Sequence, residues 1–154
     1  MTHHIEARLS DMGLSLPDAP APAANYVPYV VAGDLIHVSG QIAQDDGGPI
    51  RGRLGDDMGV EDGAAAARRC ALSLLAQAKA AAGGDLSRIA RVVKLTGFVN
   101  SAPGFTDQPK VINGASDLLV DAMGEAGRHA RSAVGVAALP LGVAVEIEAV
   151  FQLS

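Results

Sequence analysis

The last two apolar stretches of the chain carry ionisable side chains where buried strands normally have none. Residues 131–151 read RSAVGVAALPLGVAVEIEAVF, and this run contains Arg131, Glu146 and Glu148. An unpaired charge is costly to bury, so such groups are normally paired, exposed to water or used in binding and catalysis. We therefore expect at least two of these three side chains to form a ligand site or a structural ion pair.

Strand alternation predicts which residues share a face, because successive side chains of a strand point to opposite faces. In the final stretch the two glutamates alternate with an apolar set, which comprises Val143, Val145, Ile147 and Ala149. In the preceding stretch one set comprises Arg131, Ala133 and Gly135, and the other comprises Ser132, Val134 and Val136. If helices cover the sets rich in Val and Ile, the arginine and the glutamates share the opposite face, above small residues that leave room for a ligand.

A simpler alternative is that Glu146 and Glu148 lie on the solvent side of a half-exposed antiparallel sheet. However, 49% of the residues are hydrophobic and only 19% are charged, which favours a second surface that is hidden by oligomerisation. An arginine and a glutamate near a subunit interface would form either a ligand site or an ion pair. The pattern of residues leaves both open.

Length and composition also limit the classes of protein to which this chain could belong. A chain of 154 residues suits one domain that folds without metal or disulfide staples. The net charge of -5 and the aromatic content of 3% argue against a nucleic-acid partner, which needs clustered basic residues or stacking platforms. The single cysteine, Cys70, is expected in the core of a cytoplasmic protein, and no apolar run is long enough for a membrane span.

The order of the expected elements predicts an α+β fold with both long helices on one face of a sheet. The elements are a helix over 5–12, a proline-rich extended segment over 16–24, a hairpin that turns at Gly33 and Asp34, a helix over 60–82, a strand over 90–99, a second helix and two final strands. We expect residues 1–25 to form the N-terminal helix and extended segment. Residues 26–154 are expected to form a single domain.

Two separated motifs resemble one known family. The run RSAVGVAALPLGVAVEIEAVF resembles the C-terminal signature of the Rid family (YjgF, liver perchloric-acid-soluble protein), and YVPYVVAGDLIHVSGQIA is similar to its N-terminal hairpin. The resemblance spans about residues 26–151. It implies a fold like that of the Bacillus chorismate mutase, with a mixed six-stranded sheet and two helices packed on one face. It also implies that the last strand inserts into the sheet, and that the chain forms a homotrimer with clefts between subunits.

The resemblance further implies a chemistry. Active members hydrolyse reactive enamines and imines, such as 2-aminoacrylate and its imine tautomer, to 2-oxo acids and ammonia, and no cofactor or metal is expected. Arg131 matches the family's arginine, whose planar fork binds the substrate carboxylate bidentately. Glu146 matches the glutamate that orients or activates the attacking water, whereas Glu148 is expected to be solvated or structural.

Three further residues match substrate-binding positions, each with a structural alternative. Tyr26 would close the cleft or donate a hydrogen bond, or else pack at an interface. Ser39 would hydrogen-bond the ligand, or else allow a close approach of the backbone. Asn113 occupies the family's asparagine position in the second helix, but asparagine is also a common helix cap.

Two departures from the family pattern affect the expected site. Ala133 replaces the usual cysteine, which removes a thiol but leaves the backbone N–H and C=O for substrate binding. The connection over 100–130 is longer and richer in glycine than in the best-studied members, and is expected to reshape the mouth of the cleft. His129 shares the face of Arg131 by strand parity, so it is either a second acid or base or a partly exposed strand-edge residue.

Three functions are compatible with these residues. The first is the hydrolytic deaminase, and the second is a noncatalytic trimer that binds small carboxylates or a protein partner, which Ala133 and the altered connection favour. The third is an endoribonuclease, which the acidic charge and the missing aromatic platform disfavour. The sequence shows no phosphate-binding glycine loop, metal-ligand cluster or Ser-His-Asp arrangement.

Overall fold

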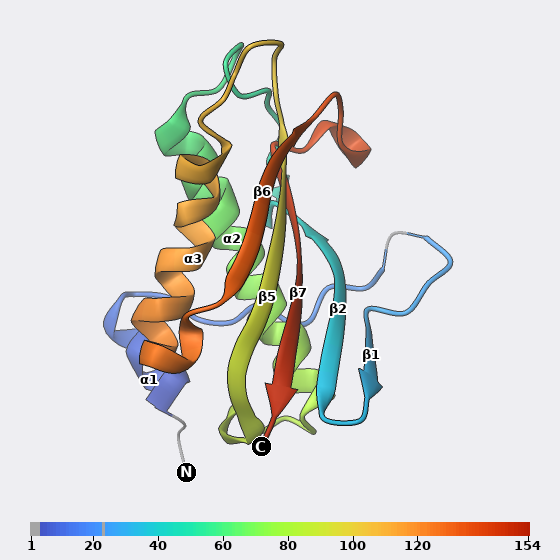
Figure 1. The fold of residues 1–154 in the computed structure, drawn as a ribbon, viewed down its shortest axis with the longest axis vertical. Helices are drawn as coiled ribbons and strands as arrows, with labels where there is room; N and C mark the ends of the chain where they lie inside the picture. Colours follow the sequence, from blue (N-terminus) through green and yellow to red (C-terminus); the bar gives the residue numbers. More distant parts are fainter. Residues whose placement is uncertain (1–3, 23) are drawn as a thin grey trace.

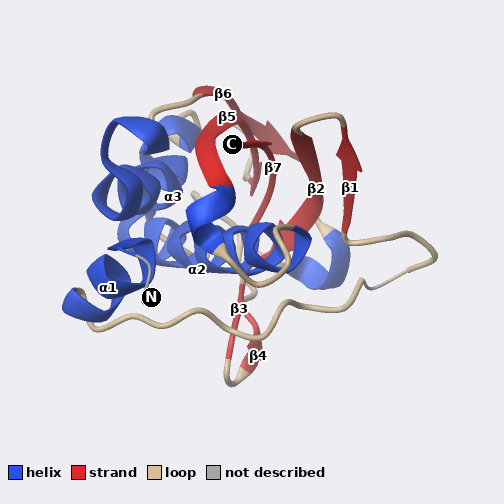
Figure 2. Ribbon diagram, turned by 90° about the horizontal axis from the view of Figure 1, so that it is seen from below, coloured by secondary structure: helices blue, strands red, loops and turns tan. Residues whose placement is uncertain are grey.

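The chain folds as a mixed β-sheet with helices packed on one face (Figure 1). The computed structural model describes residues 4–22 and 24–154. Its elements in chain order are α1 (His4–Asp11), β1 (Tyr29–Ala32), β2 (Leu35–Ile42), β3 (Gln44–Asp45), β4 (Gly48–Pro49), α2 (Val60–Ala81), η1 (Leu86–Arg88), β5 (Ile89–Asn100), α3 (Gln108–Met123), η2 (Gly124–Gly127), β6 (Ala130–Val136), η3 (Pro140–Gly142) and β7 (Val145–Leu153). Figure 2 shows α2 and α3 on the same side of the sheet, so the predicted α+β class is confirmed.

The main sheet has five strands in the order β1-β2-β7-β5-β6. β7 lies between β2 and β5 and is antiparallel to both, which confirms the expected insertion of the last strand. β6 pairs with β5 in parallel and forms one edge of the sheet. The main sheet therefore has one strand fewer than the six expected, because the glycine-rich segment after β2 folds back on itself as a separate ribbon of β3 and β4.

Small residues let α3 pack closely on α2 and on the sheet. A Cβ atom on Gly114 of α3 would overlap the backbone carbonyl of Ala64 on α2. A Cβ atom on Gly97 of β5 would lie 2.5 Å from the Ile112 side chain of α3. These contacts fix α3 directly above β5 and its neighbour β6, where the candidate site begins.

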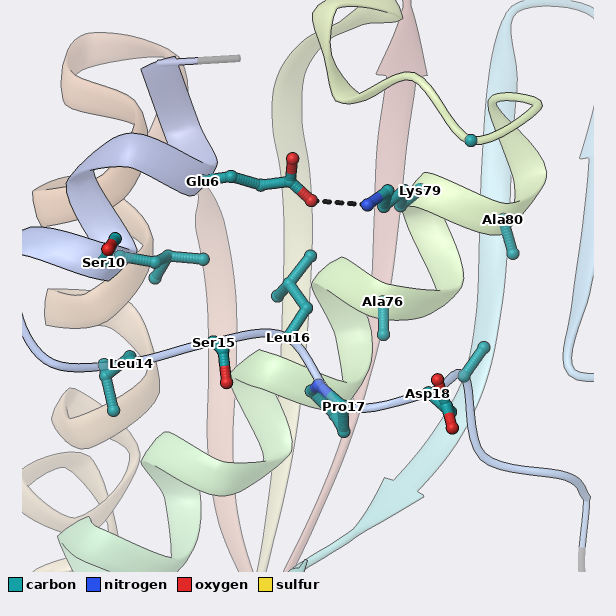
Figure 3. A pocket seen from close by; sticks show the side chains of 13 residues that line it. Glu6, Ser10, Leu14, Ser15, Leu16, Pro17, Asp18, Ala76, Lys79 and Ala80 are labelled. Carbon is teal, nitrogen blue, oxygen red and sulfur yellow. Dashed lines mark hydrogen bonds and ion pairs between the residues drawn. The ribbon is translucent and has the colours of Figure 1, made fainter. Parts of the chain in front are cut away.

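The N-terminal helix α1 is held mainly by apolar burial. Ile5 and Leu9 are 2% and 1% exposed and belong to the common core, and burying each side chain contributes roughly 1.5–3 kcal/mol. Glu6 forms an ion pair of 2.6 Å with Lys79 of α2, beside a hollow of about 550 Å³ (Figure 3). Both side chains remain partly exposed, so the pair adds at most about 1 kcal/mol. This hollow is lined by neither Arg131 nor Glu146.

The fold bears on the expected burial of the single cysteine and on membrane-spanning segments. Cys70 lies on α2 with no exposed surface, so its expected place in the core is confirmed. Burial raises the pKa of its thiol, which keeps the group protonated and unreactive. Among the described residues, none of the helices combines the length and the apolar run needed to cross a bilayer.

We expect Gly114→Ala to lower the free energy of unfolding by about 2 kcal/mol, because the added methyl group must push α3 away from the backbone of Ala64. Urea unfolding followed by circular dichroism measures the loss. Gly59→Ala is the matched control, since a Cβ atom there meets nothing within 4 Å, and it should cost no more than about 1 kcal/mol. Equal losses in the two variants would contradict the close contact between the helices.

Candidate functional site

Arg131 lies near the start of the edge strand β6, with its guanidinium against α3. Nη1 donates to Ser116 Oγ at 3.0 Å and Nη2 donates to the Pro109 carbonyl oxygen at 3.1 Å. Both acceptors are neutral, and no carboxylate lies within ion-pair distance of this side chain in the part of the chain that the structure describes. A guanidinium has five N–H donors, so Arg131 keeps an uncompensated positive charge and further donors for an anion.

A hollow of about 290 Å³ opens beside this guanidinium. It is lined by residues of α3, of the turn before β6 and of β6 itself, namely Asn113, Ser116, Asp117, Val120, Arg128, His129 and Arg131. Asn113 is exposed on α3, which begins at Gln108 after its N-cap Asp107. The helix-cap alternative for Asn113 is therefore wrong, and its side chain lies where it can contact a ligand of Arg131.

His129 is joined to the same hollow by a chain of hydrogen bonds. Its Nδ1 lies 2.6 Å from the Gly127 carbonyl oxygen, and its Nε2 lies 2.9 Å from Ser116 Oγ. A carbonyl only accepts, so in the neutral ring Nδ1 carries the proton and Nε2 accepts from the Ser116 hydroxyl. Burial lowers the pKa of His129, opposed by the Gly127 carbonyl and reinforced by the charge of Arg131. The expectation that His129 shares the face of Arg131 is confirmed.

Arg131 lies on the helix-covered face of the sheet, whereas Glu146 lies on the opposite, open face. Arg131 is directly opposite Leu95 of β5, which is fully buried in the core, and directly opposed residues share a face. Glu146 is opposite Phe98 and alternates with fully buried residues of β7. The expectation that the arginine and the glutamates share one face is therefore wrong. The expectation failed because β6 is an edge strand. Its Val134 lies on the open face, where it is 44% exposed, and not on the face covered by the helices.

Glu146 lies over an irregularity in the neighbouring strand β2. The pairing of β2 with β7 shifts register between Val38 and Gln41, and a Cβ atom on Gly40 would overlap Oε2 of Glu146. Burial, and then the charge of Glu148, raise the pKa of Glu146. A carboxylate with a raised pKa is a stronger base than a fully solvated one. Glu148 itself is exposed, as expected for a solvated side chain.

A second hollow, of about 350 Å³, lies along β2 near Glu146. Its lining includes Tyr26, which is 47% exposed, and Gly40. Ser39 donates its hydroxyl proton to the Val27 carbonyl at 2.7 Å. The Ser39 side chain therefore holds the segment that carries Tyr26, and the hollow is lined by the neighbouring glycine instead.

The structure thus divides the expected residues between the two faces of the sheet, where they form two half-sites, and leaves Ala133 and Ser39 outside the two hollows. The arginine half-site consists of Arg131, Asn113, Ser116 and His129. The glutamate half-site consists of Glu146, Tyr26 and Gly40, and Ser39 supports it by holding the segment that carries Tyr26. Ala133 is opposite Gly97 and packs against the core, which places it on the same face as Arg131. Ser116 was absent from the expected set, although its position three residues after Asn113 puts both on one helix face. Within residues 4–22 and 24–154, no cluster of His, Cys, Asp or Glu side chains could hold a metal ion.

Known proteins combine the same fold with a closely similar sequence. The family model described as "YjgF/chorismate_mutase-like, putative endoribonuclease" matches residues 6–151. The chain is 54% identical over 152 residues to Protein TCP17 of Trypanosoma cruzi, which covers 97% of this chain and 94% of the relative. The crystal structure of protein Atu1372 from Agrobacterium tumefaciens is similar at 48% identity and a TM-score of 0.91, covering 98% of this chain and 94% of the other.

A more distant solved structure contains a ligand. Escherichia coli TdcF with bound serine is 28% identical, with a TM-score of 0.62, and the match covers 88% of this chain and 94% of that one. An α+β protein with a chorismate mutase-like fold is thus the class that the architecture defines. The chain belongs to the Rid/YjgF family.

We expect Glu146→Gln to raise the free energy of unfolding at neutral pH. The folded pKa of Glu146 is raised, so its protonated form favours the folded state, and this contribution is lost as the pH rises through the folded pKa. The stability difference between variant and wild type should be small below the ordinary pKa of 4.5 and grow above it. Urea unfolding from about pH 4 to about pH 8 measures this difference. A difference that stays constant with pH would contradict the raised pKa.

Proposed function

We propose that the protein hydrolyses small, reactive 2-imino and 2-enamino acids to 2-oxo acids and ammonia, at clefts between the subunits of a homotrimer. The observation that carries this proposal is the Arg131 guanidinium, which is held by two neutral acceptors and faces a hollow of about 290 Å³. A substrate carboxylate suits this group, because a guanidinium fork binds it through two parallel hydrogen bonds. Membership of the Rid/YjgF family supports the same substrate chemistry.

The reaction requires a base for water and a proton for the departing nitrogen. Glu146, whose pKa is raised by burial, accepts a proton from water as the water oxygen bonds to the C=N carbon. The electron pair of the C=N bond moves to nitrogen, which takes the proton back from the carboxyl group. A second transfer, from the new hydroxyl group to nitrogen through Glu146, lets the C–N bond break as the C=O bond forms. An enamine first takes a proton at its terminal carbon and loses one from its nitrogen, which gives the imine.

The two half-sites can act on one substrate when they come from different subunits. Within one chain, Arg131 and Glu146 lie on opposite faces of the sheet. The open face also exposes Val30 and Val134, at 52% and 44%, and burying such residues against another copy is favourable. We therefore assign to each cleft the arginine half-site of one subunit and the glutamate half-site of its neighbour.

A substrate derived from a small amino acid fits both the hollow and the family. TdcF holds serine, and a molecule of that size matches the space beside Arg131. The proposal places the reaction in the cytoplasm, where a lone reduced cysteine such as the buried Cys70 is usual. It requires no cofactor, because proton transfer and carboxylate binding suffice for hydrolysis of a C=N bond.

Noncatalytic binding of small carboxylates is the second candidate, and Ala133 is the observation that favours it. A methyl group packs against the core on the face of Arg131, where the family resemblance leads us to expect a thiol. Endoribonuclease activity appears in the description of the family. The net charge of -5 and the aromatic content of 3% disfavour it for this chain.

The purified protein should accelerate the release of pyruvate from freshly generated 2-iminopropanoate. Arg131→Ala should lower kcat/KM by about 100-fold or more, and Arg131→Lys should recover little, because a lysine lacks the bidentate fork. Glu146→Gln should lower kcat by about 100-fold with a smaller change in KM, because it removes the base but keeps the shape of the side chain. A continuous assay of pyruvate release measures all three variants.

Two results would favour the other candidates. Pyruvate binding by the wild type without turnover would support the noncatalytic binder. RNA cleavage that persists through repurification and disappears in Arg131→Ala would support the endoribonuclease.

Mixed trimers test the division of the site between subunits. Arg131→Ala and Glu146→Gln should each be inactive alone, but an equal mixture assembled by coexpression should recover about one quarter of the wild-type activity, since about one cleft in four then has both native residues. The control mixes Arg131→Ala with the double variant Arg131→Ala/Glu146→Gln, which offers no intact cleft. Mixed trimers without recovered activity would show that a single subunit supplies both residues.

A further inference from the structure

In the arginine half-site, hydrogen bonds connect the titratable ring of His129 to the guanidinium of Arg131. The Gly127 carbonyl oxygen, the imidazole of His129, the hydroxyl of Ser116 and the guanidinium of Arg131 form one chain of hydrogen bonds, with separations of 2.6, 2.9 and 3.0 Å. Ser116 and His129 both lie in the connection between β5 and β6, where the chain departs from the family pattern. The proposed reaction uses neither residue.

We propose that Ser116 and His129 are positioning residues, which hold the Arg131 guanidinium for a substrate carboxylate and couple carboxylate binding to proton uptake by His129. This inference rests on the proposed function, because it takes the ligand of Arg131 to be a carboxylate. It predicts that a proton is taken up when the carboxylate binds, and that the imidazole of His129 takes it up.

The positioning role follows from the direction of each hydrogen bond. The Gly127 carbonyl fixes the proton on Nδ1 of His129, so Nε2 must accept the Ser116 proton. Because the Ser116 hydroxyl donates its proton to His129, the Ser116 oxygen is left to accept a hydrogen bond from Nη1 of Arg131. The Pro109 carbonyl holds Nη2. The plane of the guanidinium is thus set by two acceptors on α3, one of which depends on the state of His129.

The proton coupling follows from the charges. In the unliganded chain the positive charge of Arg131 has no carboxylate partner among the described residues, and it opposes protonation of His129. A bound carboxylate would neutralise that charge and so make protonation of the ring easier. By thermodynamic reciprocity, protonation of the ring then strengthens carboxylate binding by the same factor. Once protonated, Nε2 donates to Ser116, whose oxygen has a second lone pair for Arg131 and whose own proton becomes free for the ligand.

Other charged groups around the ring are compensated or exposed. Arg128 forms an ion pair of 3.0 Å with Glu125 of η2, and Arg91 of β5 donates to the Arg128 carbonyl at 2.8 Å. Asp117 of α3 lines the hollow but is exposed to water. Arg131 is therefore the charge whose neutralisation by a ligand has the largest effect on the ring.

The first experiment measures proton coupling by NMR, which tolerates weak binding. The imidazole signal of His129 is identified by its disappearance in His129→Gln and followed against pH, without and with saturating pyruvate. We expect pyruvate to raise the pKa of His129, and to bind about fivefold more tightly at about pH 5.5 than at about pH 8. In His129→Gln, this pH dependence should be markedly smaller, and what remains is assigned to Glu146, which the proposed function places in the same cleft. His4→Gln, the same change at an exposed histidine at the start of α1, is the matched control and should retain the full pH dependence.

The second experiment tests the positioning role of the hydroxyl group. Ser116→Ala should weaken pyruvate binding by about tenfold and raise KM more than it lowers kcat, because the hydrogen bond that orients a charged group is lost. Ser116→Thr keeps a hydroxyl group and should recover most of the affinity. Equal behaviour of the alanine and threonine variants would overturn the positioning role.

The outcomes separate this inference from the proposed function. Pyruvate binding that leaves the pKa of His129 unchanged, or an affinity whose pH dependence is as large in His129→Gln as in the wild type, would overturn the inference alone. A wild type that neither binds pyruvate nor hydrolyses 2-iminopropanoate would overturn the proposed function and this inference with it.

Discussion

The parallel pairing of β5 with β6 is the constraint on which the rest of the site depends. Two parallel strands cannot be joined by a tight turn, so the chain must cross over the sheet between them. That crossover carries α3, and it returns the chain to β6 with α3 packed on the same face. Arg131, near the start of β6, therefore meets the acceptors that α3 provides at Ser116 and Pro109.

The insertion of β7 has the complementary effect. Because β7 enters between β2 and β5, its Glu146 comes to lie in the middle of the sheet, over the irregular part of β2 at Gly40. Burial, followed by the charge of Glu148, raises the pKa of that carboxyl group. The topology thus places a basic carboxylate on one face and, near the edge of the other, a guanidinium that has no ion-pair partner among the described residues. The proposed reaction therefore needs these groups from two subunits.

Close packing of glycine and aliphatic residues keeps both arrangements in place. Gly97 on β5 and Gly114 on α3 leave room for an aliphatic side chain and for a helix backbone. A core built in this way allows little shift of α3 relative to β6, because neighbouring atoms already touch. The acceptors of Arg131 are consequently held at fixed positions, and the main adjustable element of the arginine half-site is the protonation of His129.

The sequence alone determined the type and order of the elements and the alternation within each strand. The helix near Ile5, the hairpin at Gly33 and the inserted last strand were predicted, the last of these from the family resemblance, and all are present. Glu146 was correctly placed on the face opposite the buried residues of its strand. The identities of Arg131 and Glu146 as candidates also required only their types and the motifs around them.

The tertiary structure decided how those faces relate and which distant groups meet. Alternation divides a strand into two sets but does not say which set a neighbouring helix covers, so the edge strand β6 was assigned the wrong way round through Val134. Ser116 of α3 meets both His129 and Arg131 because α3 packs back over the sheet beside β6. Such a contact joins residues far apart in the chain, and its physical origin is the packing of a crossover helix, which no local pattern of residues encodes.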